Sequence, residues 1–163
     1  FHKDFNTALE AINQLRPFDV QLIAVGGGNW TAAEQETIRR LGLTQVVKQL
    51  DMSDDGLMTL LPGAVCLLMT SRAEGFGLPL LEAFARGTPV VAADIATQRE
   101  FGGGLPLLFE PGDFSAASEQ VLHLLNEPKE SRLTKGVMRI DHARRFTWGR
   151  MAKSTAEAYQ GLV

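Results

Sequence analysis

The sequence predicts a doubly wound α/β domain built on a parallel, Rossmann-like sheet. Short apolar runs alternate with segments of helical periodicity along the whole chain, which is the pattern of repeated βα units. The apolar runs are nearly continuous, as strands are when helices cover both faces of a sheet. With 163 residues, 45% of them hydrophobic and 21% charged, the chain is long enough to bury the core of one such domain.

The expected helices and strands follow from these runs and from capping residues. Thr31 and Glu34 form a capping box at the start of one helix, and Ser53 begins another. Pro79 suits the first turn of a helix that Gly87 ends. We expect strands at residues 20–25, 44–48, 64–69, 89–92 and 105–109, of which the third is fully buried. Besides the helix at Ser53, we expect helices at residues 7–15, 31–41, 79–86, 97–101, 115–125, 129–143 and 147–160.

The most informative stretch is residues 71–90, which holds two carboxylates on either side of a glycine-rich turn. Glu74 and Glu82 are separated by seven residues. Gly75 and Gly77 lack a Cβ, so the backbone there can turn tightly and approach a ligand. Because the turn leads from a strand into a helix N-terminus, it favours an anion such as a diphosphate. Both carboxylates could contact one ligand at the carboxyl ends of the strands, where doubly wound folds bind their ligands.

This stretch resembles the E-x7-E signature of the retaining glycosyltransferases of family 4, which have the two-domain GT-B fold. The resemblance runs from about Lys3 to Tyr159 and includes a strand that ends in a glycine turn and the segment Phe146-Thr147-Trp148. It implies that residues 3–145 are the C-terminal, nucleotide-sugar-binding domain of such an enzyme. Residues 146–163 would form a helix that packs toward an N-terminal domain, which this chain does not include.

The resemblance implies roles for three charged residues, and each also has a plain structural interpretation. Glu82 would accept hydrogen bonds from the ribose hydroxyls of the nucleotide, or it could form a helical ion pair with Arg86. Glu74 would hold the transferred sugar and stabilise positive charge on its ring, close to the reacting carbon, or it could be a solvated loop acid. Lys3 would contact the donor diphosphate, with an arginine upstream of Phe1, or it could be solvated surface.

The turns carry the remaining expected contacts with the donor, although glycine turns also occur without a ligand. The resemblance implies that the sugar donor accepts hydrogen bonds from the backbone N–H groups of Gly75, Phe76, Gly77 and Leu78. It also implies that Ser71 and Gly28 bind the sugar donor. Ser71 could instead cap its turn. The ring of Phe76 is expected to anchor the loop.

Composition excludes several other classes of protein. A net charge of −3 disfavours a nucleic acid partner, which needs a basic surface. Cys66 is the only cysteine and lies in an apolar run, so it is expected to be a small buried residue without a disulfide. That is compatible with a reducing cytoplasm. His2, His123 and His142 lack metal-ligand spacing, and no Asp-x-Asp pattern occurs, so no metal is expected and no cofactor besides the nucleotide-diphosphate sugar donor.

No apolar run reaches the roughly 20 residues of a membrane span. The C-terminal part carries a basic set, which is expected to be a solvated face and alternatively to contact an anionic membrane surface. Its members are Arg139, His142, Arg144, Arg145 and Arg150. The expected location is the cytoplasm, alternatively the inner face of the membrane.

The sequence thus favours the donor half of a retaining glycosyltransferase, which by itself would bind donor weakly and transfer almost nothing. The alternatives are a non-catalytic nucleotide-binding or scaffold module of the same fold, a nucleotide-sugar epimerase and a phosphorylase. A phosphorylase would need a lysine-linked pyridoxal site, which the sequence does not identify. Base recognition is expected from backbone groups near residues 47–51. The sequence identifies neither the base nor the sugar nor the acceptor.

Overall fold

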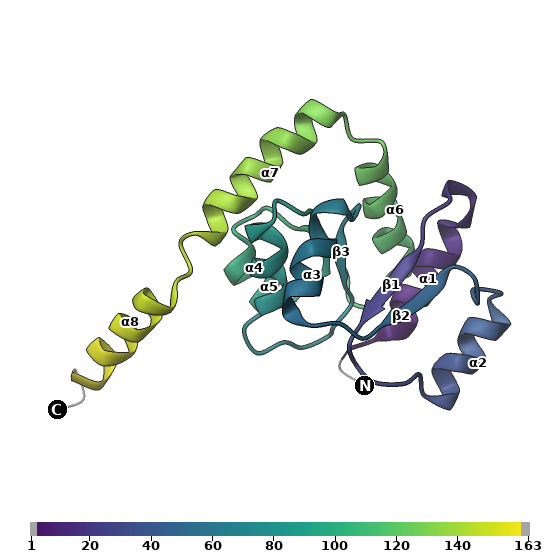
Figure 1. Cartoon of the computed structure of the whole chain (residues 1–163), viewed down its shortest axis with the longest axis horizontal. Helices are drawn as coiled ribbons and strands as arrows, with labels where there is room; N and C mark the ends of the chain where they lie inside the picture. Colours follow the sequence, from purple (N-terminus) through teal and green to yellow (C-terminus); the bar gives the residue numbers. More distant parts are fainter. Residues whose placement is uncertain (1–2, 161–163) are drawn as a thin grey trace.

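The computed structural model describes residues 3–160, apart from the side chain of Ser154, and confirms the α/β fold class. His2 and residues 161–163, on which parts of the sequence predictions fall, lie outside the described residues. The described strands alternate with helices along the chain (Figure 1). The strands are β1 (Leu22–Val25), β2 (Val47–Leu50), β3 (Leu67–Met69), β4 (Val90–Ala93) and β5 (Leu107–Phe109). The helices are α1 (Phe5–Gln14), α2 (Ala32–Arg40), α3 (Asp54–Leu60), α4 (Leu78–Ala85), α5 (Ala96–Gly102), α6 (Phe114–Leu125), α7 (Lys129–Ala143) and α8 (Trp148–Gln160), with 3-10 helices η1 (Arg16–Phe18) and η2 (Leu61–Gly63).

The strands form two hydrogen-bonded sets, whereas the sequence predicts one sheet. β1 and β2 pair in parallel, with Leu22 opposite Val47. β3, β4 and β5 also pair in parallel, in that order, so that β4 is the central strand of its set. Within residues 3–160 no strand pairs with both β1 and β3, and the two sets therefore keep separate ladders.

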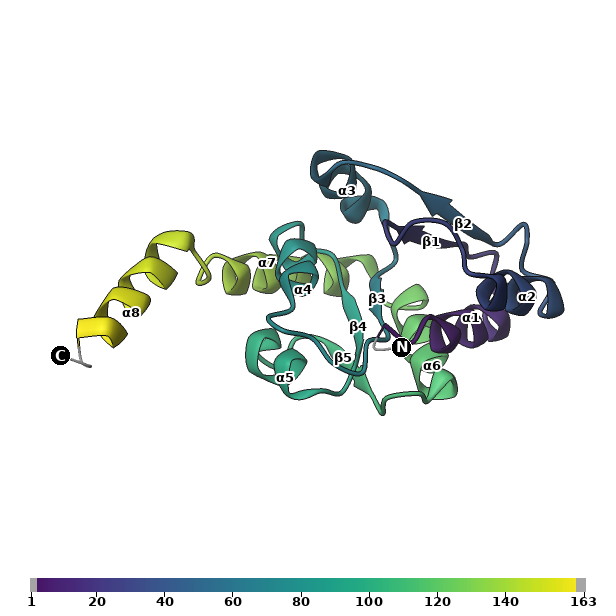
Figure 2. The same cartoon turned by 90° about the horizontal axis from the view of Figure 1, so that it is seen from below.

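The core is divided by β4, whose four residues are all buried. Val91 and Ala93 belong to a core with α1 and α6, while Val90 and Ala92 belong to a second core with α4. Successive side chains of a strand point to opposite faces, so β4 is covered on both faces. Figure 2 shows α4 and α5 on one side of this set and α1 and α6 on the other. This is the doubly wound arrangement that the apolar strands predict.

Local capping signals from the sequence are confirmed. The hydroxyl of Thr31 accepts from the backbone N–H of Glu34 at 3.2 Å, and the Glu34 carboxylate accepts from the Thr31 N–H at 2.7 Å. Ser53 accepts from the N–H of Gly56 at 3.3 Å and caps α3. These bonds satisfy backbone donors that the first turn of a helix leaves unpaired.

The observed bounds differ by one to three residues from those predicted for all five strands, and the largest differences are at the starts of β2 and β3. The strand expected at 44–48 begins only at Val47, because the N–H groups of Val46 and Val47 both donate to the carbonyl of Leu43 in the turn after α2. The strand expected at 64–69 begins at Leu67, since η2 and its closing turn precede it. Its expected full burial is also wrong, because β3 lies at the edge of its set and only its last residue is buried.

The basic set near the C-terminus is not a uniformly solvated face. Arg139 is 4% exposed and donates to the carbonyl of Gly87 at 3.2 Å. His142 is half-buried, and its Nε2 lies 2.8 Å from the carbonyl oxygen of Phe101. These two side chains hold α7 against the domain, whereas Arg144, Arg145 and Arg150 are exposed as predicted.

The last helix, α8, extends away from the other elements in both views (Figures 1 and 2). Its large apolar side chains lie open, with Trp148 76% and Tyr159 70% exposed. No helix among the described residues is long and apolar enough to cross a membrane.

Cys66 packs at the border of the core that contains α1 and α6. Burial raises the pKa of its thiol to about 12, although the nearby Arg132 guanidinium acts in the opposite direction. The thiol therefore stays protonated at neutral pH, as a structural cysteine does.

We expect Cys66 to resist alkylation in the folded chain at about pH 8, because the thiolate is the nucleophile and is almost absent. Mass spectrometry after iodoacetamide treatment measures this, with the urea-unfolded chain as the control that reacts readily. Equal labelling rates in the folded and unfolded chains would contradict the burial of the thiol.

Candidate functional site

The loop that joins β3 to α4 carries most of the predicted site residues, and its backbone is shaped by one glycine. Gly77 has φ 78° and directly precedes α4, whose first two residues are Leu78 and Pro79. A residue with a Cβ costs about 1–2 kcal/mol in this left-handed conformation. Gly75 does not share this conformation, and the space where its Cβ would lie is open to 4 Å. Gly77 therefore sets the turn, whereas Gly75 leaves room beside it.

The loop is anchored to α5. The ring of Phe76 lies 4.3 Å from that of Phe101, measured between centroids, and the hydroxyl of Thr97 donates to the carbonyl of Glu74 at 2.9 Å. Phe76 thus anchors the loop, as the sequence predicts for its ring. Phe101 in turn contacts Phe146, at a centroid distance of 5.9 Å, in the segment between α7 and α8.

Lys3 and Glu74, which lie 71 positions apart in the sequence, come together in the structure. Lys3 Nζ lies 2.8 Å from Glu74 Oε1. The Glu74 side chain is only 14% exposed and that of Lys3 is 64% exposed. The alternative of a solvated loop acid is therefore wrong for Glu74. The pair places a cation and a carboxylate side by side at the carboxyl end of β3.

The segment around Lys3 is held by contacts that the sequence analysis missed. The hydroxyl of Thr70 donates to the carbonyl of Lys3 at 3.0 Å. Arg72 Nε donates to Asp4 Oδ2 at 2.7 Å, and Asp4 has the left-handed φ of 45°. A Cβ at Gly112 would lie 2.5 Å from Arg72 Nη2, and Gly112 has φ 94°, a backbone conformation that favours glycine. Arg72 and Asp4 are neighbours of predicted residues, but nothing in the sequence pairs them.

Glu82 lies on α4 and faces the start of α3. Burial raises the pKa of its carboxyl, and the negative charge of Asp54 on α3 raises it further. Among the described residues it has no hydrogen bond or ion pair, and the ion pair with Arg86 is not formed. A half-buried carboxylate without a donor is an acceptor ready for a ligand hydroxyl.

Two further candidates are Gly28, which lies after β1 and apart from the two carboxylates, and Ser71, which lies in the loop between β3 and α4. Gly26, Gly27 and Gly28 all have positive φ, and Gln49 of β2 donates its side-chain amide to the carbonyl of Gly28. Gly28 thus follows β1, in the other set of strands. Ser71 is 6% exposed and lies two residues after the end of β3. No group of His, Cys, Asp or Glu within residues 3–160 could hold a metal ion.

We expect Arg72→Ala to loosen the N-terminal segment without unfolding the domain, because Arg72 lies outside both cores. Exposed ion pairs contribute about 0.2–1 kcal/mol, so amide exchange of residues 3–9 should rise a few-fold while that of β4 stays unchanged. Hydrogen exchange with mass spectrometry measures both segments. Arg39→Ala, which breaks the exposed pair with Glu36 on α2, is the matched control. Equal exchange at residues 3–9 in both variants would refute the role of Arg72.

We expect Glu82→Gln to raise the melting temperature at about pH 7 and to have no such effect at about pH 3. A carboxyl whose pKa is higher in the folded chain than in the unfolded chain destabilises the fold wherever it is ionised. That penalty is present at neutral pH and disappears as the pH falls below the pKa of Glu82. Scanning calorimetry measures the difference, with exposed Glu119→Gln on α6 as control. An unchanged or lower melting temperature at neutral pH would be the contrary result.

Comparison with known proteins relates this geometry to a family. The model of the family described as glycosyl transferases group 1 matches residues 1–136. The chain is 30% identical over 154 residues to a D-inositol 3-phosphate glycosyltransferase of Corynebacterium diphtheriae, covering 86% of this chain and 34% of that protein. It is also 30% identical over 166 residues to an MMP alpha-(1->4)-mannosyltransferase of Mycolicibacterium hassiacum, covering 99% and 40%. The chain thus spans 34–40% of the length of these two relatives.

Solved structures of similar fold superpose on nearly the whole of this chain. Anabaena HepE superposes with a TM-score of 0.83 at 24% identity in its complex with UDP-glucose, and with 0.81 at 25% identity in its complex with UDP and glucose. Each superposition covers 98% of this chain, with 46% and 45% of the HepE chains. The resemblance to GT-B glycosyltransferases predicted from the sequence is confirmed, and the chain belongs to the family of glycosyl transferases group 1.

Proposed function

We propose that the chain is the donor-binding half of a retaining glycosyltransferase that uses a nucleotide-diphosphate sugar. The observation that carries the proposal is the arrangement of Lys3, Glu74 and Glu82 around the turn between β3 and α4. It offers a cation, a paired carboxylate and an unpartnered carboxylate at the carboxyl end of a parallel strand, where such folds bind ligands. The similarity to glycosyltransferases, including one with UDP-glucose bound, supports the same assignment.

The first chemical requirement is to stabilise the departing diphosphate. Lys3 is mostly exposed, so its ammonium can turn from Glu74 toward a phosphate oxygen. The N-terminus of α4 adds the positive end of a helix dipole, and backbone N–H groups of residues 75–78 would donate to the phosphate or to sugar hydroxyls. Fixed donors of this kind stabilise charge that develops in the transition state.

The two carboxylates would hold opposite ends of the donor. Glu82 would accept hydrogen bonds from the ribose hydroxyls, which would relieve the cost of its unpartnered burial. Glu74 would orient the sugar and stabilise the positive charge that builds on the ring as the diphosphate leaves. The acceptor hydroxyl would then attack from the face that the diphosphate leaves, so the configuration at the reacting carbon is retained.

The acceptor site would lie mainly on an N-terminal domain of the longer protein. Because this chain spans 34–40% of its two relatives, the whole reaction belongs to the longer protein and not to these residues alone. The open apolar side chains of α8 suit a helix that packs against such a domain. A strand upstream of Phe1 that pairs with both β1 and β3 would join the two sets into one sheet. We place the protein in the cytoplasm, alternatively at the inner face of the membrane.

Calorimetric titration of the chain with UDP, GDP and ADP tests the donor site. We expect weak, saturable binding of one nucleotide and a loss of about tenfold or more in affinity for Glu82→Gln, since one hydrogen bond from a ligand to a charged group contributes about 1.5–3 kcal/mol. Glu119→Gln on α6 is the matched control and should bind normally. Equal nucleotide affinity of the unchanged chain and of Glu82→Gln would contradict the proposal. The absence of binding to any of the three nucleotides at about 1 mM would contradict it as well.

A further inference from the structure

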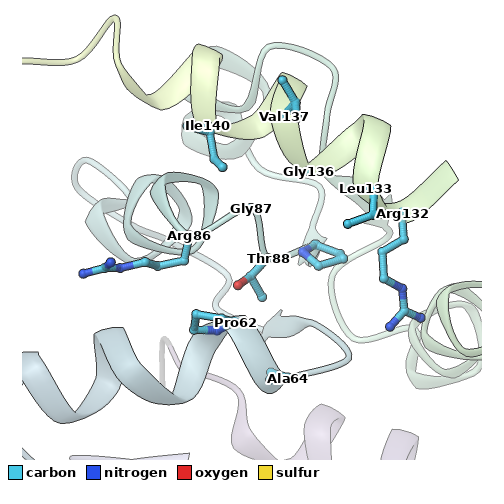
Figure 3. A pocket seen from close by; sticks show the side chains of 12 residues that line it. Pro62, Ala64, Arg86, Gly87, Thr88, Arg132, Leu133, Gly136, Val137 and Ile140 are labelled. Atoms are coloured by element: carbon cyan, nitrogen blue, oxygen red, sulfur yellow. The ribbon is translucent and has the colours of Figure 1, made fainter. Parts of the chain in front are cut away.

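A groove at the other end of the strands lies outside the candidate donor site. Its walls are η2, the turn between α4 and β4, and α7 (Figure 3). It has a volume of about 330 Å³, within the range of ligand sites in proteins. Ala64 and Pro89 line it and precede β3 and β4, whereas the loop with Glu74 follows β3. The groove therefore opens at the amino ends of the strands.

The middle of the groove is apolar. Leu133 and Val137 of α7 line it and are 62% and 59% exposed, across from Pro62 of η2. Met138, also on α7, is 52% exposed. Several large apolar side chains left open beside a groove are typical of an interaction surface.

Arginines stand at the two ends of the groove, Arg86 at one and Arg132 at the other (Figure 3). Arg132 Nη2 donates to the carbonyl of Leu124 at 2.5 Å, but its Nε is buried and has no partner among residues 3–160. Arg86 is exposed and has no hydrogen bond or ion pair from its guanidinium in the same part of the chain.

Nothing in the lining balances these charges. No carboxylate lines the groove within the described residues. The buried Glu127 lies outside the lining; its Oε1 accepts from Lys135 at 2.5 Å and from Ser131 at 2.8 Å, and its Oε2 has no partner among residues 3–160. The groove therefore combines an apolar middle with a guanidinium at each end, that of Arg86 exposed and that of Arg132 partly buried, and no carboxylate in its lining.

We propose that this groove binds a short segment of a partner protein in which apolar side chains are flanked by carboxylates. A linear peptide can present a carboxylate to each arginine while its apolar side chains fill the middle. A membrane lipid carries its anionic headgroup at one end only and matches one arginine. The chain's own α8 does not fit, because its charged residues are mainly basic, with Arg150 and Lys153 beside Glu157.

A peptide array tests the proposal with the 163-residue chain. The array holds heptapeptides with glutamate at both ends and all combinations of leucine, valine, phenylalanine and serine between them. A matched array has lysine at both ends. We expect the chain to bind members of the glutamate array that have apolar centres and none of the lysine array. The best peptide is then labelled with fluorescein and titrated by fluorescence polarisation.

Variants then locate the binding. Arg86→Gln and Leu133→Ser each change an exposed side chain, so the fold should survive, and each should weaken the peptide affinity about tenfold. Arg145→Gln, an exposed arginine outside the groove, is the matched control and should bind normally. Three results would overturn the proposal: no peptide binding, equal binding of the two arrays, or Leu133-dependent binding to phosphatidylglycerol vesicles without peptide binding. None of these depends on nucleotide binding at the opposite edge.

Discussion

Both cores of this domain meet at β4, a strand of only four residues without a polar side chain. Val90 and Ala92 pack with α4 on one face, and Val91 and Ala93 pack with α1 and α6 on the other. The carboxyl ends of β3 and β4 lead into the loop with Glu74 and into α5, which supports that loop. A volume change in β4 would disturb two packed layers at once, because protein interiors are close-packed. The position of the candidate site thus depends on a strand that presents one valine and one alanine to each core.

Local features of the fold could be predicted from the sequence because their causes are local. The capping box of Thr31 and Glu34 joins residues three positions apart, and the periodicity of residues 129–143 gives the bounds of α7 correctly. The start of β2 could not be predicted, since β propensity extends to Thr44 whereas the turn bonds to Leu43 delay the strand. The burial of Arg139 depends on a carbonyl 52 positions away, and no pattern along a helix reports such a partner.

The candidate site likewise has features that could be predicted from the sequence and features that could not. The spacing of Glu74 and Glu82 is visible in the sequence, as is the need for glycine in the turn, although only Gly77 has the left-handed backbone. The ion pair of Arg72 with Asp4, and the position of its guanidinium where a Cβ at Gly112 would lie, involve three distant segments and cannot be read from any one of them. The two carboxylates also differ physically in a manner that spacing cannot show, since Glu74 has a cation beside it and Glu82 does not.

The ring of Phe101 connects the loop between β3 and α4 to the segment that precedes α8. The ring of Phe101 contacts both Phe76 of the loop and Phe146, which precedes α8. Rings in van der Waals contact cannot move independently, so a change in the direction of α8 displaces Phe146 and then the support of the loop. A small change in the direction of α8 is therefore felt first at Phe146 and then at Phe101. The direction of α8 and the support of the turn beside Glu74 are thus linked through two ring contacts.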